Sequence, residues 1–365
     1  MDPECSPRRL LVTGGAGFIG ANFVHYWLAR YPADRVVVID LLTYAGNRAS
    51  LAAIEEHPGF RFVQGDIRDQ ALVERLLREE AIDILVHFAA ESHVDRSIAG
   101  PDAFIDTNIL GTHALLKAAR AVWLAGDAPL PGHRFHHVST DEVYGSLGQS
   151  DPAFSETTAY APNSPYSASK AASDHLVRAY HHTYGLNTTI SNCSNNYGPY
   201  QFPEKLIPLC ILNLLEGKPL PLYGDGRNIR DWLYVEDHCH GIERILERGR
   251  VGETYNIGGD NERTNLQVVE TLCGVMDTLR PEDAPHARHI RFVKDRPGHD
   301  RRYAIAADKL EYELDYTPMH RFEEALATTI HWYISHETWW RPILNGEYRE
   351  WVGSHYGSGC AASPG

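Results

Sequence analysis

Three glycines that directly follow a short apolar run constrain the fold of this chain more than any other feature. Gly14, Gly17 and Gly20 come after Leu10–Thr13 and open a stretch with helical periodicity. A tight turn after a buried strand needs glycine for positive φ, and a missing Cβ lets the backbone approach a pyrophosphate closely. The first helical turn then offers free N–H groups to the phosphates. An ordinary glycine-rich turn is the alternative, and the surrounding pattern decides between the two.

Short apolar runs alternate with amphipathic stretches through the first half of the chain. Leu10–Thr13 and Val36–Ile39 are continuous runs of β-branched residues or leucine and predict strands. Further candidate strands are Arg61–Gln64, Ile84–Phe88, His136–Ser139 and Thr188–Ser191. The stretches between them predict helices, among them Gly20–Tyr31, Gln70–Glu80 and Thr107–Val122. Buried strands that alternate with helices predict an α/β fold with a Rossmann-type, doubly wound parallel sheet.

Proline and glycine interrupt the chain more often after residue 198. We expect an NAD-binding Rossmann domain over residues 8–198, with a return to its sheet near 231–258. A smaller, C-terminal substrate-binding domain is expected over 199–230 and 259–356, with helices at Val268–Leu279 and Phe322–His336. Residues 1–7 and 357–365 are expected to be disordered tails.

Charge and composition narrow the possible partners. The 365 residues include 48 acidic and 34 basic side chains, a net charge of −14, which argues against binding to nucleic acid or anionic membranes. No apolar run reaches the ~18–20 residues of a membrane span. The six cysteines are scattered and predict free thiols in a reducing cytoplasm. Neighbouring histidines such as His238 and His240 would diverge on a helix, so no metal site is predicted.

An acidic residue lies where a dinucleotide ribose would be bound. Asp40 comes twenty residues after Gly20, at the end of the second predicted strand. A carboxylate there can accept both ribose hydroxyls and repels a 2′-phosphate, which favours NAD over NADP. Asp66 follows the third predicted strand, where it could contact adenine or cap the next helix. The small residues after Phe88 suit a cofactor that crosses the carboxyl edge of the sheet.

Tyr166 and Lys170 form a Y-x-x-x-K pattern that can carry out acid–base chemistry. Residues four apart lie on one face of a helix, so the ammonium group would stabilise a phenolate and lower the pKa of the tyrosine. Such a tyrosine is a competent base for an alcohol that gives up hydride. The pattern is common by chance on surface helices, and its place after an NAD motif favours the catalytic interpretation.

Together these two motifs resemble those of the extended short-chain dehydrogenase/reductase superfamily. Within it, the chain resembles the dTDP-glucose 4,6-dehydratase family from about Leu10 to about Tyr356. Five segments carry this resemblance: Ala89–Arg96, Ser139–Gly145, Asn192–Pro199, Ile229–Asp237 and Asp295–Tyr303. The triplet Thr140-Asp141-Glu142 is the most specific of these features, since a simple epimerase has no such carboxylate pair.

The resemblance implies oxidation of dTDP-glucose at C4, loss of water across C5 and C6, and return of the hydride to C6. It implies that Glu142 is the base at C5, Asp141 the acid at O6 and Tyr166 the base at O4. Thr140 would hydrogen-bond the C4 oxygen, and Lys170 would hold the nicotinamide ribose. The chemistry needs such a pair, because a C4 ketone acidifies the C5 proton and two carboxyls with different pKa values can act as base and acid.

The expected binding residues form two sets. The cofactor set is Gly14, Gly17, Phe18, Ile19, Gly20, Asp40, Leu41, Leu42, Thr43, Asp66, Ile67, Phe88, Ala89, Ala90, Ser92, Thr107, Tyr166, Lys170 and Asn196. The substrate set is Ser92, Thr140, Asn195, Lys205, Leu206, Pro221, Leu222, Tyr223, Arg230, Asn265, Asp295, Arg296 and His299. Glu91 could face the cofactor or support other residues. A homodimer is implied through helices at about Ala103–Val122 and Tyr166–Tyr184.

Three other functions stay open at this point. A nucleotide-sugar 4-epimerase and a UDP-glucuronate decarboxylase also begin with oxidation at C4, and an NAD-binding sensor would need no catalysis. Retention of both carboxylates with Tyr166 and Lys170 argues against a sensor. The identity of the nucleotide base follows from the resemblance alone. The loop after Gly145 is short for the family, with an unknown effect on access to the site.

Overall fold

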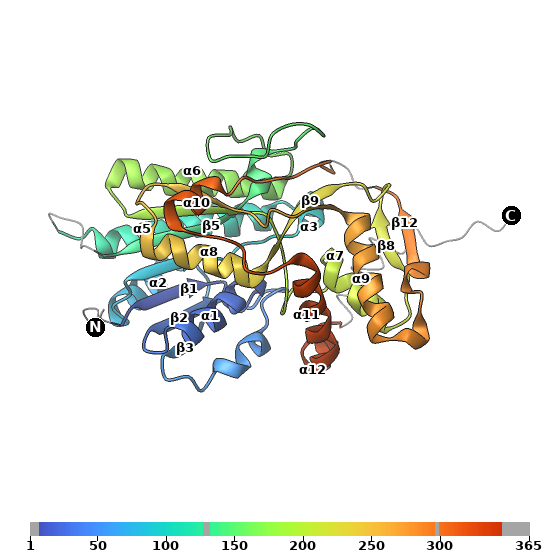
Figure 1. The fold of residues 1–365 in the computed structure, drawn as a ribbon. Coiled ribbons are helices and arrows are strands. Elements are labelled where there is room, and N and C mark those ends of the chain that lie inside the picture. Colours follow the sequence, from blue (N-terminus) through green and yellow to red (C-terminus); the bar gives the residue numbers. More distant parts are fainter. Residues whose placement is uncertain (1–6, 127–131, 296–298, 345–365) are drawn as a thin grey trace.

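A seven-stranded parallel sheet forms the centre of the molecule (Figure 1). The computed structural model describes residues 7–126, 132–295 and 299–344. The strand order is β10-β6-β5-β4-β1-β2-β3. The bounds are β1 Arg9–Thr13, β2 Arg35–Asp40, β3 Phe60–Gln64, β4 Ile84–His87, β5 Arg134–Thr140, β6 Thr188–Cys193 and β10 Thr254–Ile257. The predicted Rossmann-type parallel sheet is confirmed.

Helices cover both faces of this sheet. Contacts group α2 (Gln70–Glu79), α5 (Thr112–Trp123) and α6 (Pro165–Tyr184) on one face, and α1 (Phe18–Arg30), α8 (Val235–Arg248) and α10 (Asp308–Leu314) on the other (Figure 1). Successive residues of a strand point to opposite faces. Leu10 and Val12 therefore pack with Trp27 of α1, whereas Leu11 packs with Leu115 of α5.

A second, smaller unit lies beside the carboxyl edge of the sheet (Figure 1). It contains two small sheets, β11-β9-β7 and β12-β8. The bounds are β7 Asn195–Tyr197, β8 Leu220–Tyr223, β9 Ile229–Tyr234, β11 Glu262–Thr264 and β12 Ile290–Val293. Its helices are α7 Leu206–Leu215, α9 Asn265–Leu279, α11 Phe322–Ser335 and α12 Glu337–Trp340. These elements share a separate hydrophobic core that includes Ile211, Leu272 and Tyr333.

Short helices connect the main elements. They are η1 Arg48–Ile54, α3 Val94–Ala99, α4 Asp102–Phe104, η2 Ile105–Gly111, η3 Asp141–Tyr144, η4 Pro281–Asp283, η5 His286–His289 and η6 Arg341–Ile343. The helix predicted at Thr107–Val122 is not uniform, because η2 is a π-helix that continues into α5. A Cβ on Gly111 would lie 2.5 Å from Ile67, so this turn packs closely on the loop after β3.

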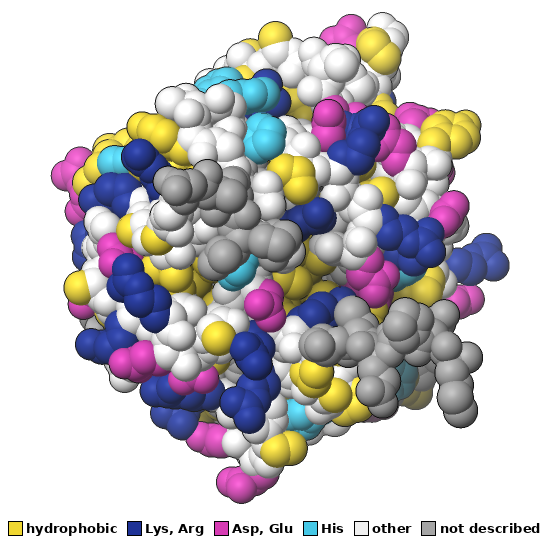
Figure 2. Space-filling view, turned by 90° about the vertical axis from the view of Figure 1, so that its left-hand side faces the viewer, with side chains coloured by type: hydrophobic (Ala, Val, Ile, Leu, Met, Phe, Trp, Pro, Cys, Tyr) yellow, Lys and Arg dark blue, Asp and Glu magenta, His cyan; other side chains and the backbone are white. Residues whose placement is uncertain are grey.

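The surface of the molecule mixes charged and hydrophobic side chains. On the face shown in Figure 2, basic and acidic side chains are interspersed, and hydrophobic side chains are scattered among them. Among the described residues, no helix has the length and apolar character that crossing a membrane requires. The described cysteines, Cys193, Cys210, Cys239 and Cys273, are buried and not in disulfides. The expected tails lie outside the described residues, apart from Pro7.

Candidate functional site

The turn between β1 and α1 has the close backbone approach that its glycines predict. Gly14 has a φ of +69°, and a Cβ there would lie 2.6 Å from the backbone nitrogen of Ala89, just after β4. A Cβ on Gly20 would lie 2.3 Å from the carbonyl oxygen of Gly14. Helix α1 begins at Phe18, and its N-cap residue, Gly17, has no side chain that could cap the helix. The N-terminal N–H groups of α1 are therefore suited to an anionic phosphate.

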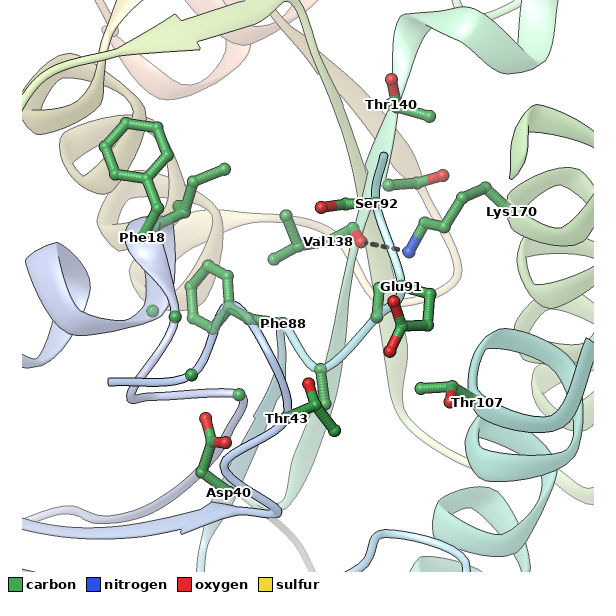
Figure 3. A pocket seen from close by; sticks show the side chains of 18 of the residues that line it. Phe18, Asp40, Thr43, Phe88, Glu91, Ser92, Thr107, Val138, Thr140 and Lys170 are labelled. Atoms are coloured by element: carbon green, nitrogen blue, oxygen red, sulfur yellow. Dashed lines mark hydrogen bonds between the residues drawn. The ribbon is translucent and has the colours of Figure 1, made fainter. Parts of the chain in front are cut away.

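A cavity of about 300 Å³ extends from this turn across the carboxyl ends of the sheet strands (Figure 3). It crosses the junction of β1 and β4, where the strand order reverses and ligands of such sheets bind. All residues of the predicted cofactor set line it except Leu42. Figure 3 places Asp40 at one end of the pocket and Thr140 with Lys170 at the other. An elongated dinucleotide would fit this arrangement.

Asp40 holds the loop at the ribose end of the pocket. Its two carboxylate oxygens accept backbone N–H groups of Ala16, at 2.9 Å, and Leu42, at 2.8 Å. Burial raises the pKa of Asp40, and these two bonds oppose that rise. Leu42 contributes its backbone to this turn, with a φ of 58°, and it is not among the residues that line the pocket. A carboxylate can accept further hydrogen bonds, so Asp40 retains capacity for a ribose.

Asp66 does not cap the helix that follows it. The N-cap of α2 is Asp69, which accepts the backbone N–H of Leu72 at 3.0 Å. Asp66 instead lines the pocket and pairs with Arg68 at 2.7 Å, which lowers the pKa of Asp66 although partial burial opposes this. Of the two interpretations left open for Asp66, the helix cap is wrong.

The carboxylate pair lies at the end of β5. Thr140 ends the strand, caps η3 and accepts the backbone N–H of Glu142 at 3.3 Å. Asp141 is 2% exposed, and its Oδ2 atom has no hydrogen-bond partner among the described residues. Burial, reinforced by Glu142 and Asp231, raises the pKa of Asp141 well above its usual range. Glu142 is less buried than Asp141. The two neighbouring carboxyls thus occupy different environments.

Tyr166 and Lys170 lie in the first turns of α6 and line the pocket. The Lys170 ammonium donates to the Val138 carbonyl at 2.8 Å (Figure 3), and burial lowers the pKa of Lys170 to about 8. The predicted depression of the Tyr166 pKa is wrong for this arrangement. Burial and the nearby Glu142 raise the pKa of Tyr166 well above its usual value, although a hydrogen bond with Thr140 opposes that rise. Desolvation outweighs the effect expected from helical spacing.

Glu91 also lines the pocket, which the sequence left undecided. Figure 3 places it between Val138 and Thr107. Its backbone is fixed by Asn108, which accepts the Glu91 N–H at 2.9 Å and donates to the Glu91 carbonyl at 3.0 Å. Burial raises the pKa of Glu91. Of the two interpretations, the one in which Glu91 faces the cofactor pocket therefore fits the structure better.

The predicted substrate set divides into two groups. Ser92, Thr140, Asn195 and Lys205 line the pocket, whereas Leu206, Pro221, Leu222, Tyr223, Arg230, Asn265, Asp295 and His299 do not. Arg296 lies outside the described residues. The second group is nevertheless gathered in the smaller unit: His299 contacts Asp295 at 2.6 Å, and its ring lies 6.1 Å from that of Tyr223.

Arg230, one of the predicted substrate residues, is buried and held by backbone carbonyls. It is 5% exposed, and its guanidinium donates to the carbonyls of Ile229, at 2.7 Å, and Asp300, at 3.0 Å. The same group lies 4.3 Å from the ring centre of Tyr303. Its charge lowers the pKa of Asp141, against the larger effect of burial. Arg230 therefore belongs to the wall behind the carboxylate pair.

Several residues that line the pocket were not predicted from the sequence. They are Ile39, Gly46, Gly65, Arg68, Val138, Ser139, Cys193, Ser194 and Gln201. Val138, Ser139 and Cys193 lie at the carboxyl ends of β5 and β6, so their strand positions were a usable signal. Arg68 and Gln201 belong to loops, where the sequence holds no comparable pattern.

Known proteins resemble this chain over nearly its whole length. Residues 11–329 match the family model described as GDP-mannose 4,6 dehydratase. The chain is 58% identical to a dTDP-glucose 4,6-dehydratase of Xanthomonas campestris pv. campestris, over 93% of this chain and 97% of that protein.

Two solved structures share the fold. One is a dTDP-glucose 4,6-dehydratase of Streptomyces venezuelae, crystallised with NAD and a second ligand. It is 51% identical to this chain with a TM-score of 0.85, and the match covers 92% of this chain and 99% of that chain. The other is the Bacillus anthracis enzyme of the same name in complex with NAD, with 47% identity, a TM-score of 0.82 and the same coverage.

Proposed function

Because the chain belongs to the dTDP-glucose 4,6-dehydratase family, we propose that Thr140, Asp141 and Glu142 are the residues that turn an oxidation into a dehydration. The protein is an NAD-dependent hydro-lyase that converts dTDP-glucose to dTDP-4-keto-6-deoxyglucose. The observation that carries the proposal is the buried, raised-pKa carboxyl of Asp141 beside the more open Glu142, at the end of a strand that faces the cofactor pocket.

The pocket residues fit NAD in shape and charge. A Cβ on Gly14 or Gly20 would lie within 3 Å of backbone atoms, so only glycine leaves this turn its close approach. Asp40 retains capacity to accept hydrogen bonds at one end of the pocket, and Lys170 supplies a buried cation at the other end. When bound, NAD would supply the hydride acceptor for C4 and the hydride donor for C6. A cationic nicotinamide would also favour the phenolate form of Tyr166 and so offset the effect of burial on its pKa.

Each proton in the proposed reaction has a named carrier. Tyr166 removes the proton of O4 as the hydride leaves C4, and the C4 oxygen, held by Thr140, becomes a ketone. Glu142 then removes the acidified C5 proton while Asp141 gives its proton to O6, so the C6 hydroxyl leaves as water. With the hydride returned to C6, Glu142 gives its proton back to C5, which gives the 4-keto-6-deoxy sugar. Tyr166 is then protonated and Asp141 ionised, and proton exchange with water restores both residues. Asp141 suits the acid role because a raised pKa keeps it protonated near neutral pH.

We assign the two groups of substrate residues to the two halves of the substrate. Ser92 and Asn195 line the pocket near the carboxylate pair and would contact the sugar. Pro221, Leu222, Tyr223, Arg230, Asn265, Asp295, Arg296 and His299, with Lys205 and Leu206, would surround the nucleotide and diphosphate. Lys205 already bridges the two regions, since its ammonium donates to the Ser92 carbonyl at 3.1 Å.

A homodimer through the region of η2, α5 and α6 is part of this proposal. Ile105 and Leu110 of η2 are 43% and 51% exposed, and Ile98 before it is 46% exposed. Apolar side chains gathered in one stretch of surface are typical of an interface. Light scattering of the purified protein tests the dimer.

We further propose a cytoplasmic location, which the buried, unpaired cysteines among the described residues support.

Incubation of the purified protein with dTDP-glucose tests the reaction. A 4-keto-6-deoxy product develops ultraviolet absorbance in alkali, whereas an epimerase would yield the galacto sugar and no keto product. UDP-glucuronate, supplied separately, should not lose carbon dioxide. Absence of turnover with every nucleotide-hexose tried would contradict the proposal and favour an NAD-binding sensor.

A further inference from the structure

A buried carboxylate outside the proposed acid–base set lies one helical turn beyond Lys170. Asp174 is fully buried on α6. Its Oδ2 atom accepts hydroxyl hydrogens from Ser139 and Tyr160, each at 2.9 Å. Its Oδ1 atom lies 3.2 Å from Nε2 of His137. Burying a carboxylate is costly, so a carboxylate retained at such a place calls for a compensating role.

The hydrogen bonds of Asp174 connect α6 with the strand end that carries the proposed catalytic triplet. Ser139 immediately precedes Thr140 on β5. Asn192 on β6 donates to the Thr140 carbonyl at 3.2 Å and to the Tyr160 hydroxyl at 3.3 Å. Asp174, Tyr160 and Asn192 therefore form one network behind Thr140. A shift of this network would move the triplet relative to the helix that bears Tyr166 and Lys170.

Lys170 lies four residues before Asp174 on α6, and the charge of Asp174 raises the pKa of Lys170 against the larger effect of burial. Helix α6 contributes Asp174 itself, and the packed strands β4, β5 and β6 contribute His87, His137 and Cys193. Burial lowers the pKa values of both histidines far below their usual range, so they are neutral near neutral pH. Burial raises the pKa of Cys193 to about 12, which keeps it neutral as well.

The surroundings of Asp174 itself are also mainly neutral. Tyr144 and Tyr160 approach it from the segment after β5, and burial raises the pKa values of both phenols. His137 faces it from β5, and His175 and Lys170 lie beside it on α6. The strongest charge interaction available to the carboxylate of Asp174 is therefore the one with Lys170.

We propose that Asp174 is a positioning residue of the reaction, which keeps Lys170 cationic and ties the Ser139-Thr140 end of β5 to α6. The inference rests on the proposed function, because it concerns the same site. Asp174 does not line the cofactor pocket, so it acts through Lys170 and through Ser139.

The pH profile of Asp174→Asn separates a charge effect from simple support. Asparagine keeps the size of the side chain and removes its charge. Lys170 acts in its protonated form, and an opposite charge nearby raises the pKa of a lysine. Loss of that charge should move the alkaline limb of kcat about one pH unit or more toward lower pH. We expect kcat near neutral pH to fall about tenfold or more, with KM changed less than about threefold.

Three further variants are matched controls. Ser139→Ala removes one hydrogen bond of Asp174, and Tyr160→Phe removes another together with the bond that Tyr160 accepts from Asn192. Both variants leave the carboxylate, so the alkaline limb should stay in place while kcat falls moderately. Asp237→Asn alters another buried aspartate, which accepts the backbone N–H groups of Met319 and His320 away from the pocket. It should leave the profile unchanged. An unshifted limb in a folded Asp174→Asn, or an equal shift in the hydroxyl variants, would overturn the proposal.

A thermal double-mutant cycle covers the case in which Asp174→Asn folds poorly, and it needs no substrate. Lys170→Met and Asp174→Asn alone each leave one buried charge without its partner. The double variant removes both charges, so its Tm should exceed that of at least one single variant. A Tm loss equal to the sum of the two single losses would refute the charge coupling. Absence of dTDP-glucose turnover by the wild-type protein would instead refute the proposed function and leave this cycle interpretable.

Discussion

Replacement of Asp141 by asparagine should separate the oxidation of the sugar from its dehydration. Asparagine keeps the shape of the side chain but cannot deliver a proton to O6. Removal of a positioned general acid costs about 10²- to 10⁴-fold in rate. Oxidation at C4 relies on Tyr166 and should be much less affected. Reduced NAD should therefore accumulate on Asp141→Asn after dTDP-glucose is added, and it should decay slowly.

The same substitution should make the fold more stable at neutral pH. Within the described ranges, the buried Oδ2 atom of Asp141 has no hydrogen-bond partner. Leaving a buried polar group unsatisfied costs about 1–3 kcal/mol, more if it is charged. The folded-state pKa is raised, so the folded protein keeps a proton that the unfolded chain releases. Wild-type stability therefore falls as pH rises above the unfolded pKa, by about 1.4 kcal/mol per pH unit until the folded pKa is reached.

Two measurements test this prediction together. Single-turnover absorbance follows the appearance and decay of reduced NAD, and urea unfolding at acidic and neutral pH gives the free energy of unfolding. The stability advantage of Asp141→Asn should grow from acidic to neutral pH. Normal turnover by the variant would refute the assignment of the acid. A variant less stable than wild type at neutral pH would refute the argument from burial.

Three further substitutions test other parts of the account. Tyr166→Phe should fold normally but fail to reduce bound NAD when dTDP-glucose is added, and retained reduction would contradict its role as base. Asp40→Asn should raise the dissociation constant for NAD about 10- to 100-fold, because it weakens bonds worth about 1–3 kcal/mol; calorimetry that finds an unchanged constant would argue against ribose binding there. Gly20→Ala places a Cβ 2.3 Å from the Gly14 carbonyl and should lower the free energy of unfolding by about 1–3 kcal/mol. The matched control is Gly274→Ala on α9, where a Cβ meets nothing within 4 Å and should be neutral or stabilising by about 0.5–1 kcal/mol in chemical denaturation.

Features that depend on local sequence were predicted well. The apolar runs place β1 and β2 within one residue of their observed bounds, because strands buried on both faces read as continuous apolar segments. The glycine turn and Asp40 lie in the pocket, because they follow strands whose carboxyl ends meet at one edge. The short strands β7 and β11, of three residues each, were not predicted, since so few residues carry no readable periodicity.

Features that depend on burial could not be predicted. Helical spacing places Lys170 on the face of Tyr166, but only the packed structure reveals that desolvation and Glu142 dominate the pKa of Tyr166. Arg230 is a substrate candidate in the sequence, and only the packed structure shows that backbone carbonyls hold its guanidinium and that its charge lowers the pKa of Asp141. Asp174 carries no motif at all, and its network becomes visible only when β5, β6 and α6 are packed together.

The fate of the hydrogen at C4 of the substrate distinguishes a dehydratase from an epimerase. We suggest incubation of the protein with dTDP-glucose that carries deuterium at C4, followed by mass spectrometry and NMR of the product. A dehydratase that oxidises C4, eliminates water and returns the same hydride should give a 4-keto-6-deoxy sugar with the deuterium at C6. Deuterium retained at C4 of a galacto product would contradict the account and identify an epimerase.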